Sequence, residues 1–371
     1  MALDSLLRYK IGITLINGVG NVVARQLIAH LGSAEAVFKE SKENLAKIPG
    51  IGTFLSAEIV GQDVLKRADE EIEFILKNNI FPVYFTDNNY PYRLKECPDA
   101  PLLLYVKGAP EFNNGHYVGV VGTRNATEYG KELCKNLIKD LAASQPNCCI
   151  VSGLAYGIDI CAHKAALEFA CRTLAVVGHG LDRIYPATHR SIAEKMLQTG
   201  GIATEYLSQT TPERQNFVQR NRIIAGLCDA VVVVESGERG GSLLTANAAN
   251  AYNRDVFAFP GRVGDEHSAG CNSLIKQNKA ALIESANDLE KYMGWEQSTT
   301  KKASIQPALF VELNEKQQKI VSLLHGEKNG IQTNQIAVSL SLPISEVSAM
   351  LLTLEFSGIV KNLPGNVYKL V

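Results

Sequence analysis

The sequence lacks several features that would assign a class of protein at once. None of its eight cysteines forms a CxxC pair, and their scattered positions in apolar stretches predict buried free thiols in a reducing cytosol. Lysine and arginine number 37 against 38 aspartates and glutamates, so the formal net charge is −1. Binding of nucleic acid would therefore require a local basic patch, since the chain as a whole is not basic.

Long hydrophobic runs are also absent. No apolar stretch reaches membrane-spanning length, and the start, MALDSLLRYKIGITLING, lacks the charged, apolar and small-residue pattern of a secretion signal. We therefore expect a cytoplasmic protein without membrane insertion. With 371 residues, 46% apolar and 20% charged, the chain should form two or three soluble domains.

What the chain does have is a repeated unit of apolar strand, glycine-rich turn and helix. The clearest copies lie at 117–130, 148–163, 173–186 and 230–249. Uniformly apolar strands such as VVVV at 231–234 suit a parallel sheet that is covered on both faces. The pattern predicts an α/β fold, a doubly wound Rossmann-like and mostly parallel sheet, over residues 117–292.

Each glycine-rich turn then falls at the carboxyl edge of the sheet, where open α/β sheets bind ligands. Glycine lets the backbone approach a ligand, and the following helix points free N–H groups at an anion. Several such turns on one edge predict an extended phosphate-bearing ligand. The candidate turn residues are Gly122, Ser152, Gly153, Gly240 and Ser242.

Arg124 stands at the end of the first of these strands, in VVGTRNATEYG. Small neighbours would let a ligand come close, and a guanidinium can clamp a phosphate with two hydrogen bonds. A surface salt bridge is the alternative for this arginine.

The stretch 211–230 has the most unusual composition. Between 213 and 222, three arginines and one glutamate give a local charge of +2, with Phe217 among them. Basic side chains beside an aromatic ring suit a single strand, because charge binds its backbone and the ring stacks a base. The candidates are Arg214, Phe217, Arg220, Asn221 and Arg222. On a helix, Arg220 and Arg222 would lie about 160° apart, so one of them is structural; Phe217 is alternatively a core residue.

Other constellations are weaker. Asp159 and His163 are four residues apart and could form an acid–base pair, but an aspartate stabilised by a helix N-terminus is the preferred interpretation. GERGGSLLTANAA at 237–249 resembles the phosphate loop of a nucleotide-modifying enzyme, yet no carboxylate follows it. We find no metal-ligand cluster and expect no cofactor.

The flanking regions predict further domains. Residues 1–70 contain two copies, 32 residues apart, of a Gly-x-Gly turn followed by a helix, at 15–28 and 47–60. They resemble paired helix–hairpin–helix motifs, which either hold DNA phosphates or only pack. A proline-rich bridging extension over 71–116 should include one edge strand, PLLLYVKG at 101–108.

A linker is expected over 293–311, rich in Ser, Thr and Lys after Gly294. Three short helices and a hairpin over 312–371 match a winged helix. Its third helix carries Glu346 and Glu355 and no basic residue, so contact with a protein is favoured over duplex reading.

The central motifs together resemble the DNA processing protein A family (DprA, or Smf). They are VVGTR, SGLAYGID, AHKAAL, VVGHGLD, YP, FVQRNRIIAG, VVVVES, GGSLLTA, FPG and SAGCNSLI, in order across 117–283. Two departures are His189, where the family usually has Asn, and Asn278–Lys279, where it usually has Gly–Ala.

The resemblance implies a non-enzymatic mediator of natural transformation. Such a protein binds and protects incoming single-stranded DNA, forms a homodimer through its Rossmann-like domain and loads the RecA recombinase. It also implies DNA contacts at Arg124, Phe217 and Arg214. The alternatives are a nucleotide-processing enzyme, such as a phosphoribohydrolase, and a scaffold in which the turns are only tight connections.

Overall fold

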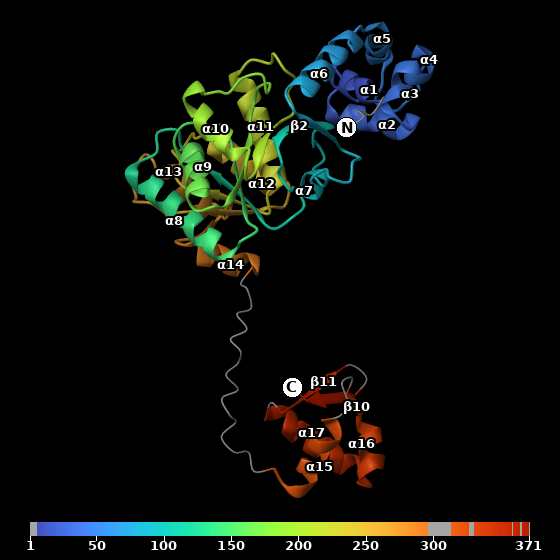
Figure 1. Cartoon of the computed structure of the whole chain (residues 1–371), viewed down its shortest axis with the longest axis vertical. Helices are drawn as coiled ribbons and strands as arrows, with labels where there is room; N and C mark the ends of the chain where they lie inside the picture. Colours follow the sequence, from blue (N-terminus) through green and yellow to red (C-terminus); the bar gives the residue numbers. More distant parts are fainter. Residues whose placement is uncertain (1–5, 296–312, 326–329, 358, 364–365, 371) are drawn as a thin grey trace. The chain divides into compact units, whose positions relative to one another are not determined.

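The structure, a computed structural model, describes residues 6–295, 313–325, 330–357, 359–363 and 366–370 (Figure 1). The chain divides into two compact units, Met1–Glu296 and Gln297–Val371. The predicted linker lies outside the described residues from position 296 onward.

A nine-stranded sheet forms the centre of the first unit, in the order β1-β2-β6-β5-β4-β3-β7-β8-β9. The seven strands β3 to β9 are mutually parallel, whereas β1 pairs with β2, and β2 with β6, in antiparallel fashion. This confirms the predicted doubly wound Rossmann-like sheet. The strands are β1 (Phe81–Tyr84), β2 (Leu103–Gly108), β3 (Tyr117–Val121), β4 (Cys149–Ser152), β5 (Arg172–Val176), β6 (Gly201–Thr204), β7 (Ala230–Val233), β8 (Asp255–Ala258) and β9 (Ala281–Leu282).

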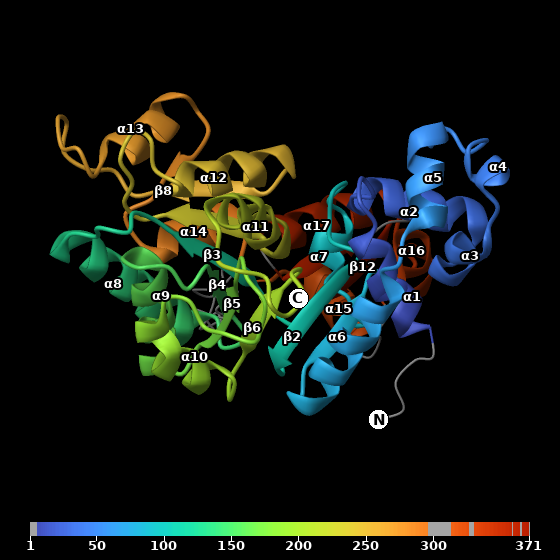
Figure 2. The same ribbon diagram turned by 90° about the horizontal axis from the view of Figure 1, so that it is seen from above.

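Helices cover both faces of this sheet (Figure 2). One face packs against α8 (Glu128–Ser144), α9 (Ile158–Glu168), α10 (Arg190–Met196) and α14 (Ala286–Met293). The other packs against α7 (Tyr92–Lys95), α11 (Arg214–Leu227), α12 (Ser242–Ala251) and α13 (Ala269–Lys276). Because strand side chains alternate, Val118 and Val120 enter one core while Tyr117 and Val121 enter the other. Burial on both faces explains why the strands are uniformly apolar.

The order of the strands reverses between β3 and β7. The chain passes from β3 through α8 to β4 on one side, and from β7 through α12 to β8 on the other. Just beyond these strands, the Thr123 N–H donates to the Glu235 carbonyl at 2.7 Å. Such a switch point is where doubly wound sheets bind ligands at their carboxyl edge.

The predicted edge position of the PLLLYVKG strand is wrong. β2 lies inside the sheet between β1 and β6, and β1 is the edge strand. The short run FPVY, which forms β1, was not recognised as a strand. Its Pro82 fits an edge, since proline cannot donate to a second neighbouring strand.

The helical region precedes β1. Its helices are α1 (Leu7–Gly12), η1 (Ile13–Leu15), α2 (Asn21–Leu31), α3 (Ala34–Lys39), α4 (Lys42–Leu45), α5 (Thr53–Gly61) and α6 (Leu65–Lys77). Since α6 runs to Lys77, helix continues past the boundary expected at residue 70.

The two Gly-x-Gly turns have the same backbone. Gly18 and Gly50 have φ of 77° and 81°. Gly20 and Gly52 precede α2 and α5 with ψ of 175° and 176°. Directly after the first turn, at the start of α2, the Asn21 side chain accepts a hydrogen bond from the Leu102 N–H at 3.1 Å, next to β2.

The second unit is a winged helix, as predicted. It contains α15 (Glu315–Leu324), β10 (Ile331–Gln332), α16 (Thr333–Leu340), α17 (Ile344–Phe356), β11 (Val360–Leu363) and β12 (Val367–Leu370). The hairpin β11–β12 is joined by β10, a two-residue strand that the sequence pattern did not reveal. The hydrophobic core of the winged helix includes Ile320, Ile336 and Leu351.

Among the helices described, none is by itself long and apolar enough to cross a membrane. Taken together, α16 and α17 are long and apolar enough by length and composition alone, but the two helices are bent by 115° relative to each other.

Candidate nucleic-acid interface

Arg124 reaches the carboxyl edge because the chain turns sharply after β3. A Cβ at Gly122 would come within 2.4 Å of the Ile158 side chain and 2.9 Å of the Glu235 carbonyl oxygen, so only glycine fits there. Two residues later, Arg124 is exposed. The role of Gly122 is thus to let β3 end tightly between two neighbouring loops.

Phe217 meets Arg124 from α11. The guanidinium carbon of Arg124 lies 5.9 Å from the centre of the partly buried Phe217 ring. Tyr185, in the loop between β5 and α10, stacks on the same ring with centroids 5.7 Å apart and planes at 25°. The structure thus brings two predicted residues together and adds an aromatic residue that our sequence reasoning did not single out. The sequence does contain a feature that could have indicated Tyr185, namely an aromatic residue in a loop that follows a buried strand.

The exposed arginines of this edge lack carboxylate partners. Arg214 begins α11, and no hydrogen bond or ion pair joins its side chain to the described residues. The same holds for Arg124, apart from its contact with the Phe217 ring. Arg239, in the turn after β7, is exposed and likewise without an ion pair in the described part of the chain. These guanidinium groups are free to bind an anion.

Arg220, by contrast, lies inside the protein. Its side chain is 4% exposed and donates to the backbone carbonyls of Gly153, at 2.7 Å, and of Val176. Burial lowers the pKa of this guanidinium to about 10, against the effect of the neighbouring Asp159. The structure places it behind the edge, where it joins the loop after β4 to the last residue of β5.

Arg222 is also held by the protein. Its guanidinium donates to the Asp99 carbonyl at 2.8 Å and forms an ion pair with Glu205. Asn221 lies between the two arginines; its amide oxygen accepts from the Arg220 Nε at 3.2 Å, and its amide N–H₂ points to the Gly241 carbonyl at 3.4 Å. The sequence left open which of the two arginines faces a ligand, and in the structure both have internal partners.

The glycine-rich turns offer fewer free donors than expected. The Gly153 N–H donates to the Asp159 carboxylate at 3.1 Å, and the Gly240 N–H to the Gly237 carbonyl at 3.0 Å. The hydroxyl of Ser152 donates to the Val120 carbonyl at 2.6 Å, and that of Ser242 to the Ser236 hydroxyl at 2.8 Å. Both serines are buried. These residues shape the turns, and their polar groups are already paired.

Asp159 and His163 do not form a pair. Asp159 accepts from the N–H groups of Gly153 and Ala155, and burial raises its pKa. His163 lies 2.7 Å from the Thr173 hydroxyl, and burial lowers its pKa to about 3. A neutral buried histidine with its own partner is a structural residue.

Glu235 is a buried carboxylate that we did not predict at the switch point. One carboxylate oxygen accepts from the Thr127 N–H at 2.9 Å and the other from the Thr127 hydroxyl at 2.6 Å. Both oxygens are therefore occupied at the start of α8, and the group braces β7 against that helix.

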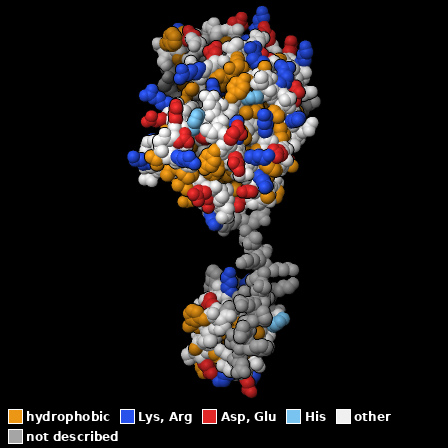
Figure 3. Space-filling model, turned by 90° about the vertical axis from the view of Figure 1, so that its left-hand side faces the viewer, with side chains coloured by type: hydrophobic (Ala, Val, Ile, Leu, Met, Phe, Trp, Pro, Cys, Tyr) orange, Lys and Arg blue, Asp and Glu red, His pale blue; other side chains and the backbone are white. Residues whose placement is uncertain are grey.

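No metal cluster marks another site in the described part of the chain. No group of three or more His, Cys, Asp or Glu side chains could hold a metal among the described residues. On the face shown in Figure 3, basic and acidic side chains are interspersed over the larger unit.

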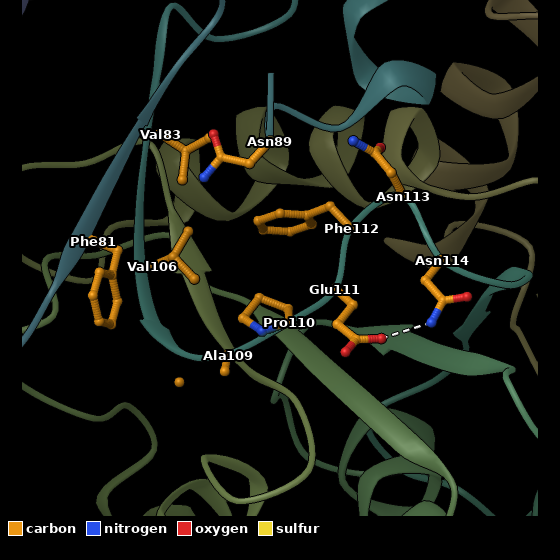
Figure 4. A pocket seen from close by; sticks show the side chains of 11 residues that line it. Phe81, Val83, Asn89, Val106, Ala109, Pro110, Glu111, Phe112, Asn113 and Asn114 are labelled. Carbon is orange, nitrogen blue, oxygen red and sulfur yellow. Dashed lines mark hydrogen bonds between the residues drawn. The ribbon is translucent and has the colours of Figure 1, made fainter. Parts of the chain in front are cut away.

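A cavity of about 560 Å³ lies beside β1 and β2 (Figure 4). It reaches Gly108, which pairs with Gly201 at the start of β6, so it lies at the amino end of the parallel strands. Phe81, Val106 and Phe112 line it, and its one charged side chain, Glu111, accepts from Asn114 at 2.6 Å. It holds no basic group for a phosphate.

The exposed surface of α17 in the winged helix is uncharged or paired. Glu346 forms an ion pair with Lys316 at 2.5 Å, and the Glu355 carboxylate accepts from the Asn362 N–H at 3.3 Å. Ile344, Leu352 and Phe356 are exposed along this helix. Nothing on it would bind phosphate.

The fold and this edge define a Rossmann-like α/β protein with an added helical region and a winged helix. A family model described as DNA recombination-mediator protein A matches residues 82–294, and one described as the DprA winged helix domain matches residues 306–366. The chain belongs to the DprA/Smf family, as the motif order indicated.

Relatives support this membership along the chain. The protein Smf of Synechocystis is 34% identical over 97% of this chain and 98% of its own length. The DNA processing protein DprA of Bacillus subtilis is 38% identical over 57% of this chain and 70% of its own length.

Two solved structures agree. DprA of Streptococcus pneumoniae superposes with a TM-score of 0.66 and 32% identity, covering 78% of this chain and 98% of that one. DprA of Helicobacter pylori, described for its single-stranded DNA binding mode, gives a TM-score of 0.52 and 28% identity over 58% of this chain and 96% of that one.

Proposed function

We propose that this protein is a recombination mediator that binds single-stranded DNA along the carboxyl edge of its sheet. The observation that carries the proposal is the group formed by Arg124, Phe217 and Tyr185 at that edge. An unpaired guanidinium beside aromatic rings offers both interactions that a single strand needs, charge for phosphates and a flat face for bases. The Helicobacter pylori relative, described for single-stranded DNA binding, supports the same ligand here.

The surroundings favour a single strand over a duplex. A base must be unpaired to stack on a ring. On α8, Lys131, Lys135 and Lys139 follow one another at one-turn spacing, but Lys131 pairs with Glu128 and Lys135 with Glu168. Arg214 and Arg239 extend the unpaired charge beyond Arg124, so several phosphates of one strand can be neutralised. Residues such as Arg220 and Gly153 hold the loops in place behind these contacts.

We further propose that the protein acts as a homodimer, protects incoming DNA in natural transformation and loads the RecA recombinase. Membership of the recombination-mediator family supports these roles. Two edges in one dimer would bind a long strand with higher avidity than one, because the second contact is intramolecular.

The rival enzyme function receives no support from the site. A phosphoribohydrolase-like reaction needs a carboxylate near the GGS turn, and the nearby Glu235 has both oxygens bonded to Thr127. Turnover of a nucleoside monophosphate by pure protein would revive this alternative.

A gel-shift titration of the purified protein against single-stranded and blunt duplex DNA over a salt series tests the proposal. We expect tighter binding of the single strand and a linear fall of log K with log salt. Equal affinity for both forms, or no binding at all, would contradict it. RecA filament formation on the bound strand, with and without this protein, tests the loading step separately.

A further inference from the structure

The stack at the edge contains an aromatic residue whose exposure has no structural explanation. Tyr185 is 47% exposed, although its ring packs on Phe217. Phe217 itself is partly buried and contacts both the Tyr185 ring and the Arg124 guanidinium. The tyrosine is therefore the aromatic surface that an incoming base meets with the least obstruction.

The spacing of the rings gives the same answer. A base held between two rings needs them roughly 7 Å apart, twice the usual base spacing of about 3.4 Å. The centroids of Tyr185 and Phe217 are 5.7 Å apart. A base therefore does not fit between them as they stand, but it can stack on the exposed part of Tyr185 while Phe217 supports that ring from behind.

A second half-exposed tyrosine lies against the same loop. Tyr156, in the turn after β4, is 48% exposed, and its hydroxyl is 3.4 Å from the Thr188 hydroxyl. Its ring meets His189 edge to face, with centroids 4.9 Å apart. The segment 185–189 thus carries one exposed aromatic ring, Tyr185, and contacts another, Tyr156.

We propose that Tyr185 forms a second base subsite, at which an unpaired nucleobase stacks on its ring. This rests on the proposed single-strand function and extends it from one stacking residue to two, Phe217 on α11 and Tyr185 in the loop after β5. The ligand of the subsite is a nucleobase of any type, since stacking on a ring is tolerant of sequence.

The test compares full-length variants at Tyr185 for affinity to oligothymidylate. Tyr185→Leu keeps an apolar group on Phe217 without an aromatic face, and Tyr185→Phe keeps the ring without the hydroxyl. We expect Tyr185→Leu to bind about 5- to 150-fold more weakly, the range for one base stack, and Tyr185→Phe to match the parent. Tyr92→Ala is the control. Tyr92 is also about half exposed (48%), but it lies at the amino end of the parallel strands, away from the candidate site, since its neighbour Arg93 pairs with Asp229 just before β7 begins.

Photocrosslinking with 5-iodouracil in the strand supplies the second readout. A base stacked on Tyr185 should crosslink to the peptide that contains it, and Tyr185→Leu should remove that product. Unchanged affinity of the leucine variant, an equal loss in the phenylalanine variant, or no crosslink at Tyr185 would each overturn the subsite. If the parent itself does not bind single strands, the proposed function fails; if the parent binds and Tyr185→Leu binds equally well, only this inference fails.

Discussion

The start and the middle of α11 use arginine in opposite ways. At its start, Arg214 and the neighbouring Arg124 are exposed and carry no ion pair with the described residues. About two turns further on, Arg220 and Arg222 are held by backbone carbonyls and by Glu205. The same residue type, within nine positions of one helix, is unpaired at the helix start and bonded inside the protein at its middle.

The difference lies in what surrounds each guanidinium. A buried arginine must have partners because desolvation of its charge is costly, and Arg220 finds them in the carbonyls of Gly153, after β4, and Val176, the last residue of β5. An exposed arginine can remain unpaired in water, which leaves its charge available. The local charge of +2 in this stretch therefore overstates the charge offered to DNA.

The largest effect on stability should come from substitution of the buried Arg220. Arg220→Ala removes the donor that joins the loop after β4 to β5 and leaves the buried Asp159 without its neighbouring positive charge, which should cost about 3–5 kcal/mol of unfolding free energy. Urea denaturation measures it, with Gln219→Ala, an exposed neighbour on the same helix, as the control. If the variant is as stable as the parent but binds DNA more weakly, Arg220 contacts DNA and is not a structural residue.

A smaller effect, on binding alone, is expected at the exposed end. Phe217→Ala should weaken single-strand binding by about 1–3 kcal/mol, the value of one base–aromatic stack, while thermal stability changes little. Val218→Ala, one residue along and 46% exposed, should bind like the parent. Unchanged affinity of a folded Phe217→Ala protein would assign that ring to packing.

The smallest effect should follow removal of the winged helix. A chain shortened to end at Ser298 should keep single-strand affinity within a few-fold, because α17 offers no unpaired basic group. A loss of tenfold or more, about 1.4 kcal/mol, would show that the winged helix contributes to DNA binding.

The fold followed from the sequence where one pattern dominated. Apolar strands and glycine turns predicted the parallel sheet and its carboxyl edge, and the winged-helix order was correct. Two elements were missed: β10 contains only two residues, and β1, four residues long like β4 and β7, includes Pro82 and an exposed Phe81 and so lacks their uniformly buried pattern. Misplacing β2 at the edge followed directly from missing β1.

The site was predictable in position but less so in detail. Arg124 and Phe217 lie together at the edge, as the motifs indicated. The acceptors of the Ser152 hydroxyl and of the Arg220 guanidinium are carbonyls more than 30 residues away in the chain, which local sequence cannot reveal. Tyr185 became a candidate site residue only through its contact with Phe217, which the structure reveals.

The salt dependence of Arg124→Ala tests the central claim most directly. On single strands, log K falls with log salt by about 0.7 for each phosphate contact, through counterion release. If Arg124 holds one phosphate, Arg124→Ala should bind more weakly at low salt and flatten that slope by about 0.7, so that the parent and variant curves converge at high salt. Lys139→Ala, exposed on α8 away from the edge, should leave the slope unchanged. A parallel downward shift for Arg124→Ala at matched folded fraction, with no change of slope, would contradict the account.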